Sequence, residues 1–194
     1  MIVAFFDFDG TITRKDSFLD FISFTHGKLQ LWVGLFMYSY YILGYKLKWV
    51  SDQKLKELFI SHYYKGTTAQ EFKKLGIEYC EHKLSDIIFS KALKRIQWHK
   101  NQSHRVVVVT ASISQWIKPW CDELGIEIIA SELEIQQDKI TGKLAGKNCN
   151  GPEKVSRIKE RYDLDAVTYC YAYGNSNGDK ELLAIADEQY YQYF

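Results

Sequence analysis

Two acidic residues near the start of the chain have the spacing of a reactive carboxylate pair. Asp7 and Asp9 directly follow the apolar run of residues 2–6, in the motif DFDGT. As a strand unwinds into a loop, both side chains can face one pocket, where one carboxylate attacks phosphorus and the other moves a proton. Repulsion between two anions roughly 4 Å apart opposes such an attack by about 4 kcal/mol at an effective dielectric of about 20. The chemistry therefore needs cations nearby.

Three later motifs supply the other groups that phosphoryl transfer requires. Thr110, Ala111 and Ser112 end a run of valines and lie close to a predicted helix start, where hydroxyl and backbone N–H groups suit an anion. Lys154, in the sequence GPEKV, supplies a positive charge. The motif GNSNGD at residues 174–179 adds an amide and an acid. Oxygen ligands of this kind suit Mg²⁺.

Apolar, β-branched runs precede these motifs and predict the strands that position them. Ligands of an open parallel sheet bind at the carboxyl ends of its strands, so motifs that follow strands would meet at one edge. The alternation of strands and helices predicts an α/β fold, a Rossmann-like parallel sheet with helices on both faces. The predicted strands are residues 2–6, 105–110, 125–130, 168–173 and 190–194.

Capping residues predict the helices between the later strands. Ser114 can cap a helix that ends at Gly125, and Pro152 suits the first turn of another. These helices are predicted at residues 114–124, 152–161 and 178–186, with a small hairpin at 133–144.

Residues 16–84 differ from the rest of the chain because they predict helices only. Asp16 and Ser51 are suitable caps, and residues 68–71 have the capping-box pattern. We therefore expect a helical cap at 16–84, inserted after the first strand, and a core of residues 1–15 and 85–194. The predicted helices cover 17–25, 29–45 and 51–63 and begin again at 68, and a helix at 85–100 returns the chain to the sheet.

The segment 29–45 is free of charge and rich in aromatic side chains. A membrane-spanning helix needs about 20 mainly apolar residues, whereas this segment has 17, including four tyrosines. We therefore predict a buried or membrane-touching cap helix in preference to a transmembrane one. Its apolar stripe forms either the core of the cap or a ligand site.

Composition excludes several classes of function. The formal net charge of +1 is too small for binding nucleic acid by bulk electrostatics. The four cysteines include no CxxC pair, which argues against zinc ribbons and thioredoxins. No P-loop or GxGxxG run is present. The first ten residues do not resemble a signal peptide, so we expect a cytoplasmic protein, or one peripheral on the inner face of the membrane.

The order DFDGT, VVVVTAS, GPEKV and GNSNGD resembles the haloacid dehalogenase (HAD) superfamily of aspartate-dependent phosphatases. The helical insertion resembles its subfamily IB, the phosphoserine-phosphatase-like group. This resemblance implies a HAD-like fold, a Mg²⁺ cofactor and an aspartyl-phosphate intermediate. Asp7 would be the nucleophile, Asp9 the acid and base, and Lys154 the group that neutralises the nucleophile and the phosphate.

The resemblance also implies two sets of binding residues. The phosphate would be bound by Gly10, Thr110, Ala111, Ser112 and Lys154. The metal would be bound by Asp7, the backbone carbonyl of Asp9, Asn175 and Asp179.

Asn175 departs from the family pattern, which usually has an acid at this position. An amide oxygen can still ligate Mg²⁺, but the site loses one negative charge, so Asp179 becomes the more important anion. We expect a weaker affinity for the metal. The alternative is a non-catalytic protein that only binds phosphate.

The apolar cap favours a phosphate carried on an apolar body over phosphoserine, whose charged groups would need charged partners. The sequence is also more similar to the phosphatidylglycerophosphate-phosphatase-like members of the group than to phosphoserine phosphatases. We predict hydrolysis of a lipid-like phosphate monoester. The alternatives are a phosphatase for phosphoserine or another small metabolite, and transfer of the phosphoryl group to an alcohol.

Overall fold

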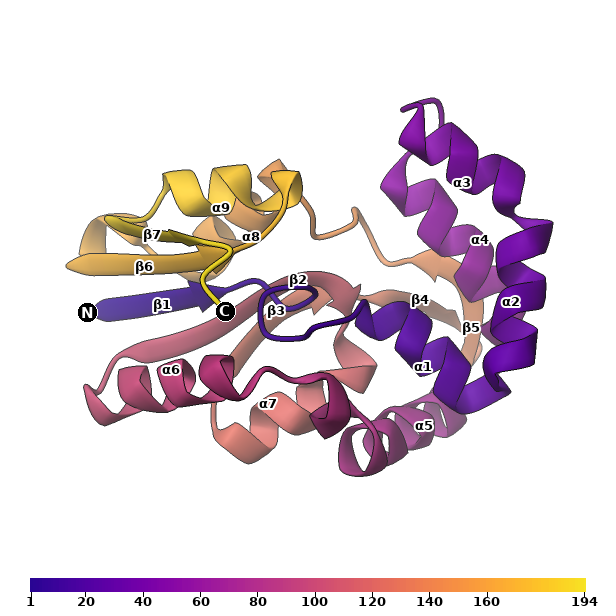
Figure 1. Ribbon diagram of the computed structural model, residues 1–194, viewed down its shortest axis with the longest axis horizontal. Coiled ribbons are helices and arrows are strands. Elements are labelled where there is room, and N and C mark those ends of the chain that lie inside the picture. Colours follow the sequence, from indigo (N-terminus) through magenta and orange to yellow (C-terminus); the bar gives the residue numbers. More distant parts are fainter.

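The computed structural model describes the whole chain, residues 1–194, and contains a five-stranded parallel sheet (Figure 1). The strand order is β3-β2-β1-β6-β7, so the first strand lies at the centre. This arrangement confirms the predicted α/β fold. The strands are β1 (Ile2–Phe6), β2 (Arg105–Ile113), β3 (Glu127–Ser131), β6 (Tyr169–Gly174) and β7 (Glu188–Tyr191).

Burial on both faces explains why the central strands are apolar throughout. Val3 and Phe5 of β1 belong to one hydrophobic cluster, whereas Ala4 and Phe6, which alternate with them, belong to another. A pair of helices covers each face (Figure 1). They are α6 (Ser90–Asn101) and α7 (Lys118–Leu124) on one face, and α8 (Pro152–Arg161) and α9 (Lys180–Ala184) on the other.

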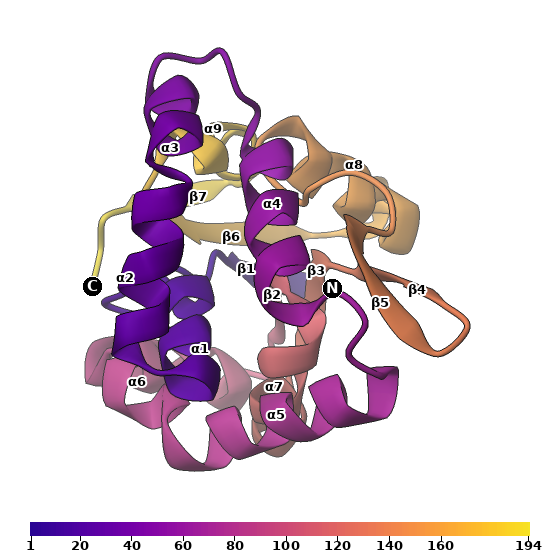
Figure 2. The same cartoon turned by 90° about the vertical axis from the view of Figure 1, so that its right-hand side faces the viewer.

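Five further helices form a layer beyond the carboxyl ends of the strands (Figures 1 and 2). The side chains of Asp16, Ser51 and Thr68 accept hydrogen bonds from first-turn N–H groups, and Glu71 completes the capping box, as predicted. The helices are α1 (Ser17–His26), α2 (Lys28–Met37), α3 (Ser39–Lys46), α4 (Asp52–Tyr64) and α5 (Ala69–His82).

The predicted hairpin, β4 (Leu133–Gln136) and β5 (Lys139–Leu144), packs against this helical layer. The backbone N–H of Gly66 donates to the carbonyl of Ile140 at 2.9 Å, and Ser61 Oγ donates to the carbonyl of Gly142 at 3.1 Å. Two distant stretches of sequence therefore form the layer. The division into a core of 1–15 and 85–194 and a cap of 16–84 stays a prediction.

The prediction of a single helix at 29–45 is wrong, because the chain breaks at Tyr38 into α2 and α3. The ring of Tyr38 packs against Phe59 and His62 of α4, with ring centroids 5.3 and 5.6 Å apart. The apolar stripe that faces the core continues across the break and consists of Leu31, Leu35, Tyr38 and Ile42. No helix in the structure has the length and apolar character needed to cross a bilayer.

Two other helices begin later than predicted, because tertiary hydrogen bonds compete with helix formation. A short 3₁₀ helix covers Leu84–Ile87. The N–H of Phe89 then donates to the carbonyl of Ile12 at 2.8 Å, and Ile88 and Phe89 are extended until α6 begins at Ser90. Ser114 does not cap a helix, since its hydroxyl donates to Glu132 Oε2 at 2.7 Å. A short 3₁₀ turn at Ser114–Trp116 comes first, and α7 begins after it.

Gly76 lies where α5 packs most closely on the chain that follows β2. A Cβ at this position would lie 2.1 Å from the carbonyl oxygen of Gln115, a backbone atom that cannot rotate away. We expect Gly76→Ala to lower the free energy of unfolding by about 1–3 kcal/mol in urea denaturation. Gly44→Ala is the control, because its added Cβ meets only the Val50 side chain. Equal losses in the two variants would contradict the tight α5 contact.

Candidate active site

The strand-end motifs meet at one cavity of about 160 Å³, between the sheet and the helical layer. Most of the predicted site residues line it, and Gly10 and Asn175 lie just outside the lining. The helical layer contributes the opposite wall. The lining residues are Asp7, Asp9, Asp16, Phe18, Lys56, Thr110, Ala111, Ser112, Asn150, Lys154, Ser176 and Asp179.

Lys154 forms two buried ion pairs at the bottom of the site. Its Nζ lies 2.5 Å from Asp7 Oδ1 and 2.6 Å from Asp179 Oδ1. Pro152 begins α8, which places Lys154 in the first turn of that helix, beside the ends of β1 and β6. Burial disfavours the ammonium, but the two carboxylates outweigh it and raise the pKa of Lys154, so the lysine stays charged.

Asp179 is held by hydrogen bonds on both carboxylate oxygens. Oδ1 accepts from Lys154, and Oδ2 accepts from the N–H and hydroxyl of Ser176 at 2.9 and 2.7 Å. Burial alone would raise the pKa of Asp179, yet Lys154 and Ser176 lower it. Asp179 is therefore an ionised, fixed anion.

Asp7 has one oxygen on Lys154 and one that faces a second group of oxygen atoms. Thr11 Oγ1 lies 3.1 Å from Asp7 Oδ2 and 3.3 Å from Asn175 Oδ1. Burial raises the pKa of Asp7 to about 6, although Lys154 opposes the rise. Asp7 Oδ2 and Asn175 Oδ1 therefore both lie beside the Thr11 hydroxyl.

Gly10 permits this approach of Asn175. Its φ is +80°, and a Cβ there would lie 2.2 Å from Asn175 Nδ2. The structure therefore shows a steric reason for glycine at this position. Its phosphate-binding role stays a prediction.

Asp9 is fixed by the helical layer and by β2 together. Asp9 Oδ1 accepts from the N–H of Ser17 at 2.7 Å, and Oδ2 accepts from the hydroxyl of Ser112 at 2.5 Å. Burial and the nearby Asp16 raise the pKa of Asp9 to about 6, despite these hydrogen bonds. Asp9 thus has a proton affinity suited to acid–base work near neutral pH.

The end of β2 departs from regular pairing where an anion site was predicted. The register between β2 and β3 shifts between Thr110 and Ile113, which takes Ala111 and Ser112 out of the ladder. The N–H of Ser112 donates to Thr110 Oγ1 at 3.0 Å. Thr110 and Ser112, two of the five predicted phosphate ligands, therefore contact each other, and the Ser112 hydroxyl faces Asp9.

Lys56 of α4 is a site residue that sequence reasoning missed. Its Nζ donates to the carbonyl of Ala111 at 2.6 Å and to Asn148 Oδ1 at 3.0 Å, both neutral oxygens. Burial lowers the pKa of Lys56 more than the nearby acids raise it. The sequence pattern of a predicted cap helix does not show that one of its lysines lies in the site.

Asn148 and Asn150, in the loop before α8, both donate to Asp52 Oδ2 at 2.8 Å.

A larger cleft of about 370 Å³ adjoins the cavity and is mostly apolar. The two share the residues Asp16, Phe18, Lys56, Ala111 and Asn150. Leu35, Ile42, Tyr45 and Lys46 line the cleft from α2 and α3, and Phe59 lines it from α4. A ligand at the carboxylates can therefore extend beneath the helical layer.

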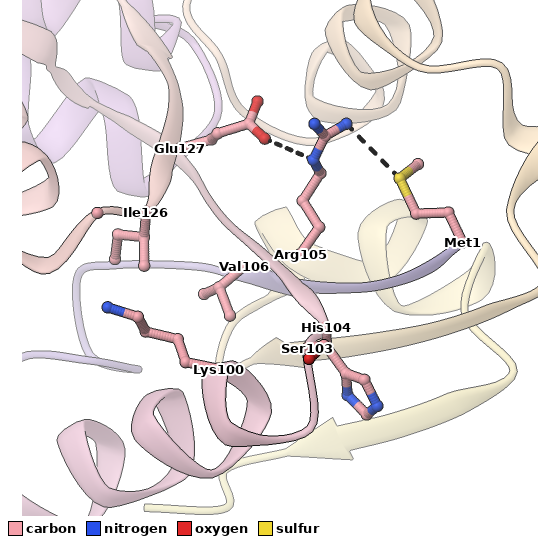
Figure 3. A pocket seen from close by; sticks show the side chains of 9 residues that line it. Met1, Lys100, Ser103, His104, Arg105, Val106, Ile126 and Glu127 are labelled. Carbon is pink, nitrogen blue, oxygen red and sulfur yellow. Dashed lines mark hydrogen bonds and ion pairs between the residues drawn. The ribbon is translucent and has the colours of Figure 1, made fainter.

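A third pocket, of about 430 Å³, lies at the opposite, amino-terminal edge of the sheet (Figure 3). Arg105 and Glu127 line it, but their charges are already paired at 2.8 Å. None of the predicted site residues lies there. Size alone therefore does not identify the reactive cavity.

The family of haloacid dehalogenase-like hydrolases matches residues 4–184. The chain belongs to this family. The match includes all the site residues described above, from Asp7 to Asp179.

Two related proteins match nearly the whole chain. Protein CicA of Caulobacter vibrioides is 33% identical over 199 residues, which cover 100% of this chain and 86% of CicA. A probable phosphatase of Mycobacterium tuberculosis is 27% identical over 187 residues, which cover 93% of this chain and 64% of that protein. Family and relative together support a phosphatase.

Solved structures share the fold. A protein of unknown function from Bordetella pertussis has a TM-score of 0.84 at 19% identity, covering 97% of this chain and 88% of that chain. A probable phosphoserine phosphatase from Vibrio cholerae has a TM-score of 0.72 at 12% identity, covering 98% and 55%.

The raised pKa of Asp9 predicts a pH-dependent cost to stability. Its ordinary pKa of 3.8 becomes about 6 in the fold, so folding disfavours the ionised form and stability is lost as the pH rises between these values. We expect Asp9→Asn, without metal, to be more stable than the parent by on the order of 1–2 kcal/mol at about pH 7 and unchanged at about pH 4. Urea denaturation with chelator measures both. An equal difference at the two pH values would contradict this origin.

Proposed function

We propose that this protein hydrolyses phosphate monoesters with Mg²⁺, through an aspartyl-phosphate formed on Asp7. The observation that carries the proposal is the buried ion pair of Asp7 with Lys154, in one cavity with a second carboxylate, Asp9. A fixed ammonium offsets the repulsion between a carboxylate and an incoming phosphate. Membership of a hydrolase family and a related probable phosphatase support the same chemistry.

In the proposed reaction, a carboxylate oxygen of Asp7 attacks phosphorus as the bond to the ester oxygen breaks. Asp9, whose pKa is about 6, donates a proton to the leaving oxygen. The Asp9 carboxylate then takes a proton from water, whose oxygen attacks the phosphorus of the aspartyl-phosphate. Phosphate is released and the Asp7 carboxylate is restored. Lys154 offsets negative charge throughout, and Thr110, with the backbone after it, binds phosphoryl oxygens.

The oxygen atoms around Asp7 suit Mg²⁺. Asp7 Oδ2 and Asn175 Oδ1 converge on the Thr11 hydroxyl, and carboxylate and amide oxygens are ligands that Mg²⁺ accepts. Asp7, the carbonyl of Asp9 and Asn175 would hold the ion. Both oxygens of Asp179 are engaged, so Asp179 would act through water. The bound ion would supply positive charge against the incoming phosphate.

A variant of Asn175 tests the metal assignment. We expect Asn175→Asp to lower the Mg²⁺ concentration for half-maximal phosphate release by about tenfold, because it adds a negative ligand, a change of about 1.4 kcal/mol. Asn177→Asp is the matched control, since it adds the same charge to an exposed position of the same loop. Asp7→Asn should be inactive at every Mg²⁺ concentration. The same shift in both asparagine variants would refute a ligand role for Asn175.

The apolar cleft favours a substrate with an apolar body. Most of its lining side chains are hydrophobic, and it opens from the cavity that holds the carboxylates. Phosphoserine would leave this volume unfilled, whereas the body of a lipid-like ester would occupy it. We therefore assign a lipid-like phosphate such as phosphatidylglycerophosphate as the substrate class. Such a substrate lies in a membrane, so the proposal includes peripheral contact through residues 29–45, on the cytoplasmic side.

Lys56 supports this choice of substrate. Phosphatidylglycerophosphate carries a phosphodiester near its terminal phosphate, and Lys56 lies on the wall shared by cavity and cleft. Its ammonium bonds only neutral oxygens. An anionic group of the substrate beside Lys56 would therefore pair with a partly buried ammonium that forms no ion pair in the structure.

The substrate test compares phosphate release from detergent-dispersed phosphatidylglycerophosphate and from phosphoserine, with Mg²⁺ and with chelator. We expect the lipid to be preferred by about 100-fold in kcat/KM, or about 2.7 kcal/mol, and no release with chelator. Lys56→Met should lower kcat/KM for the lipid by about tenfold, mainly through KM. Lys54→Met, exposed on the same helix, should not. A preference for phosphoserine would make the aromatic segment ordinary cap core.

A further inference from the structure

Helices α2 and α3 are apolar on the side that faces away from the core as well as on the side that faces it. Eleven of the 18 large apolar side chains exposed in the whole protein lie between residues 29 and 49. Phe36 is 82% exposed, Trp49 is 76% exposed and Trp32 is 68% exposed. Single exposed apolar residues are common, but a contiguous group of this kind marks a contact surface. We call the exposed side chains of residues 29–49 the outer face.

The charged side chains of the segment that carries the outer face have one sign. Residues 21–51 contain no Asp or Glu, and their charged side chains are the exposed lysines Lys28, Lys46 and Lys48. An apolar surface with a basic margin complements a bilayer that contains anionic lipids. Trp and Tyr, which are frequent on this face, favour the boundary between acyl chains and headgroups.

The lengths of the two helices allow them to lie along a membrane but not to cross it. Helix α2 has 10 residues and α3 has 8, or about 15 and 12 Å, against a hydrocarbon core of about 30 Å. Figure 2 shows the two helices following one another along one side of the helical layer. Helices too short to cross the core can lie along the membrane surface, with their exposed apolar side chains at the boundary of the acyl chains.

We propose that the outer face docks this protein on an anionic bilayer. Leu35 and Ile42 line the apolar cleft from the inner sides of the same helices, and Tyr45 of the outer face lines it as well. Docking would therefore bring the cleft wall at Tyr45 close to the membrane, and the use of this arrangement for a substrate rests on the proposed lipid-phosphate activity. Binding to the bilayer itself rests only on the outer face.

The test is flotation of the full chain with vesicles of phosphatidylcholine alone or mixed with phosphatidylglycerol, without substrate or Mg²⁺. We expect flotation with the anionic vesicles, weakened by added salt. Phe36→Glu combined with Trp49→Glu should weaken binding at least tenfold. Ile135→Glu, which puts the same charge on an exposed apolar position of the hairpin, should not. Lys28→Gln and Lys48→Gln should each weaken binding about fivefold.

Two measurements keep the result interpretable. Circular dichroism and turnover of p-nitrophenyl phosphate should be unchanged in the outer-face variants, because none of these residues lines the cavity. Absence of the wild-type protein from floated vesicles, or equal flotation of the glutamate variants, would overturn the proposal. The proposal would also be overturned if light scattering showed a dimer that Phe36→Glu dissociates and the protein did not bind vesicles.

Failure of docking is distinguishable from failure of the proposed substrate. Flotation without hydrolysis of phosphatidylglycerophosphate would support docking and refute the substrate. Hydrolysis of the detergent-dispersed lipid without flotation would refute docking alone.

Discussion

The buried ammonium of Lys154 holds together three parts of the chain that must meet for the site to exist. Asp7 follows β1, Lys154 lies in the first turn of α8 and Asp179 follows β6, and the two ion pairs measure 2.5 and 2.6 Å. Removing one partner of such a buried ion pair leaves an unpaired charge and lowers the free energy of unfolding by about 3–5 kcal/mol. The strand ends are therefore fixed by electrostatics as well as by the apolar faces of the sheet.

The charges of the site explain its unusual proton affinities and are the reason why the proposed function includes a metal. The cavity lining contains four carboxylates, Asp7, Asp9, Asp16 and Asp179, and two ammonium groups, Lys56 and Lys154, so a surplus of two negative charges remains when all are ionised. Burial of this surplus raises the pKa of Asp7 and of Asp9 to about 6. A divalent cation would cancel it. An acid at position 175 would enlarge the surplus, so Asn175 eases repulsion in the metal-free protein and would bind the proposed ion less tightly than an acid.

The sheet and the groups at its edge could be predicted from sequence because each depends on local patterns. Apolar runs predicted the strands, and the residues at the ends of these runs, such as Asp7 and Thr110, lie at the carboxyl edge of the sheet. Lys56 could not be predicted, because only the packing of α4 brings its ammonium to Ala111. The break at Tyr38 depends on the rings of Phe59 and His62, which lie on another helix. The sequence therefore did not predict the features that depend on contacts between distant segments.

The apolar outer side of α2 and α3 is not needed to hold these helices in place. The inward stripe already packs against the core, through Leu31, Leu35, Tyr38 and Ile42. Exposed apolar area opposes solubility at roughly 25 cal/mol per Å², so polar residues on the outer side would serve the fold better. The proposed lipid-like substrate would change this balance, because moving acyl chains into water costs about 0.8 kcal/mol per methylene. In the proposed docked state the chains would stay in the membrane while the phosphate reaches Asp7, which would avoid that cost.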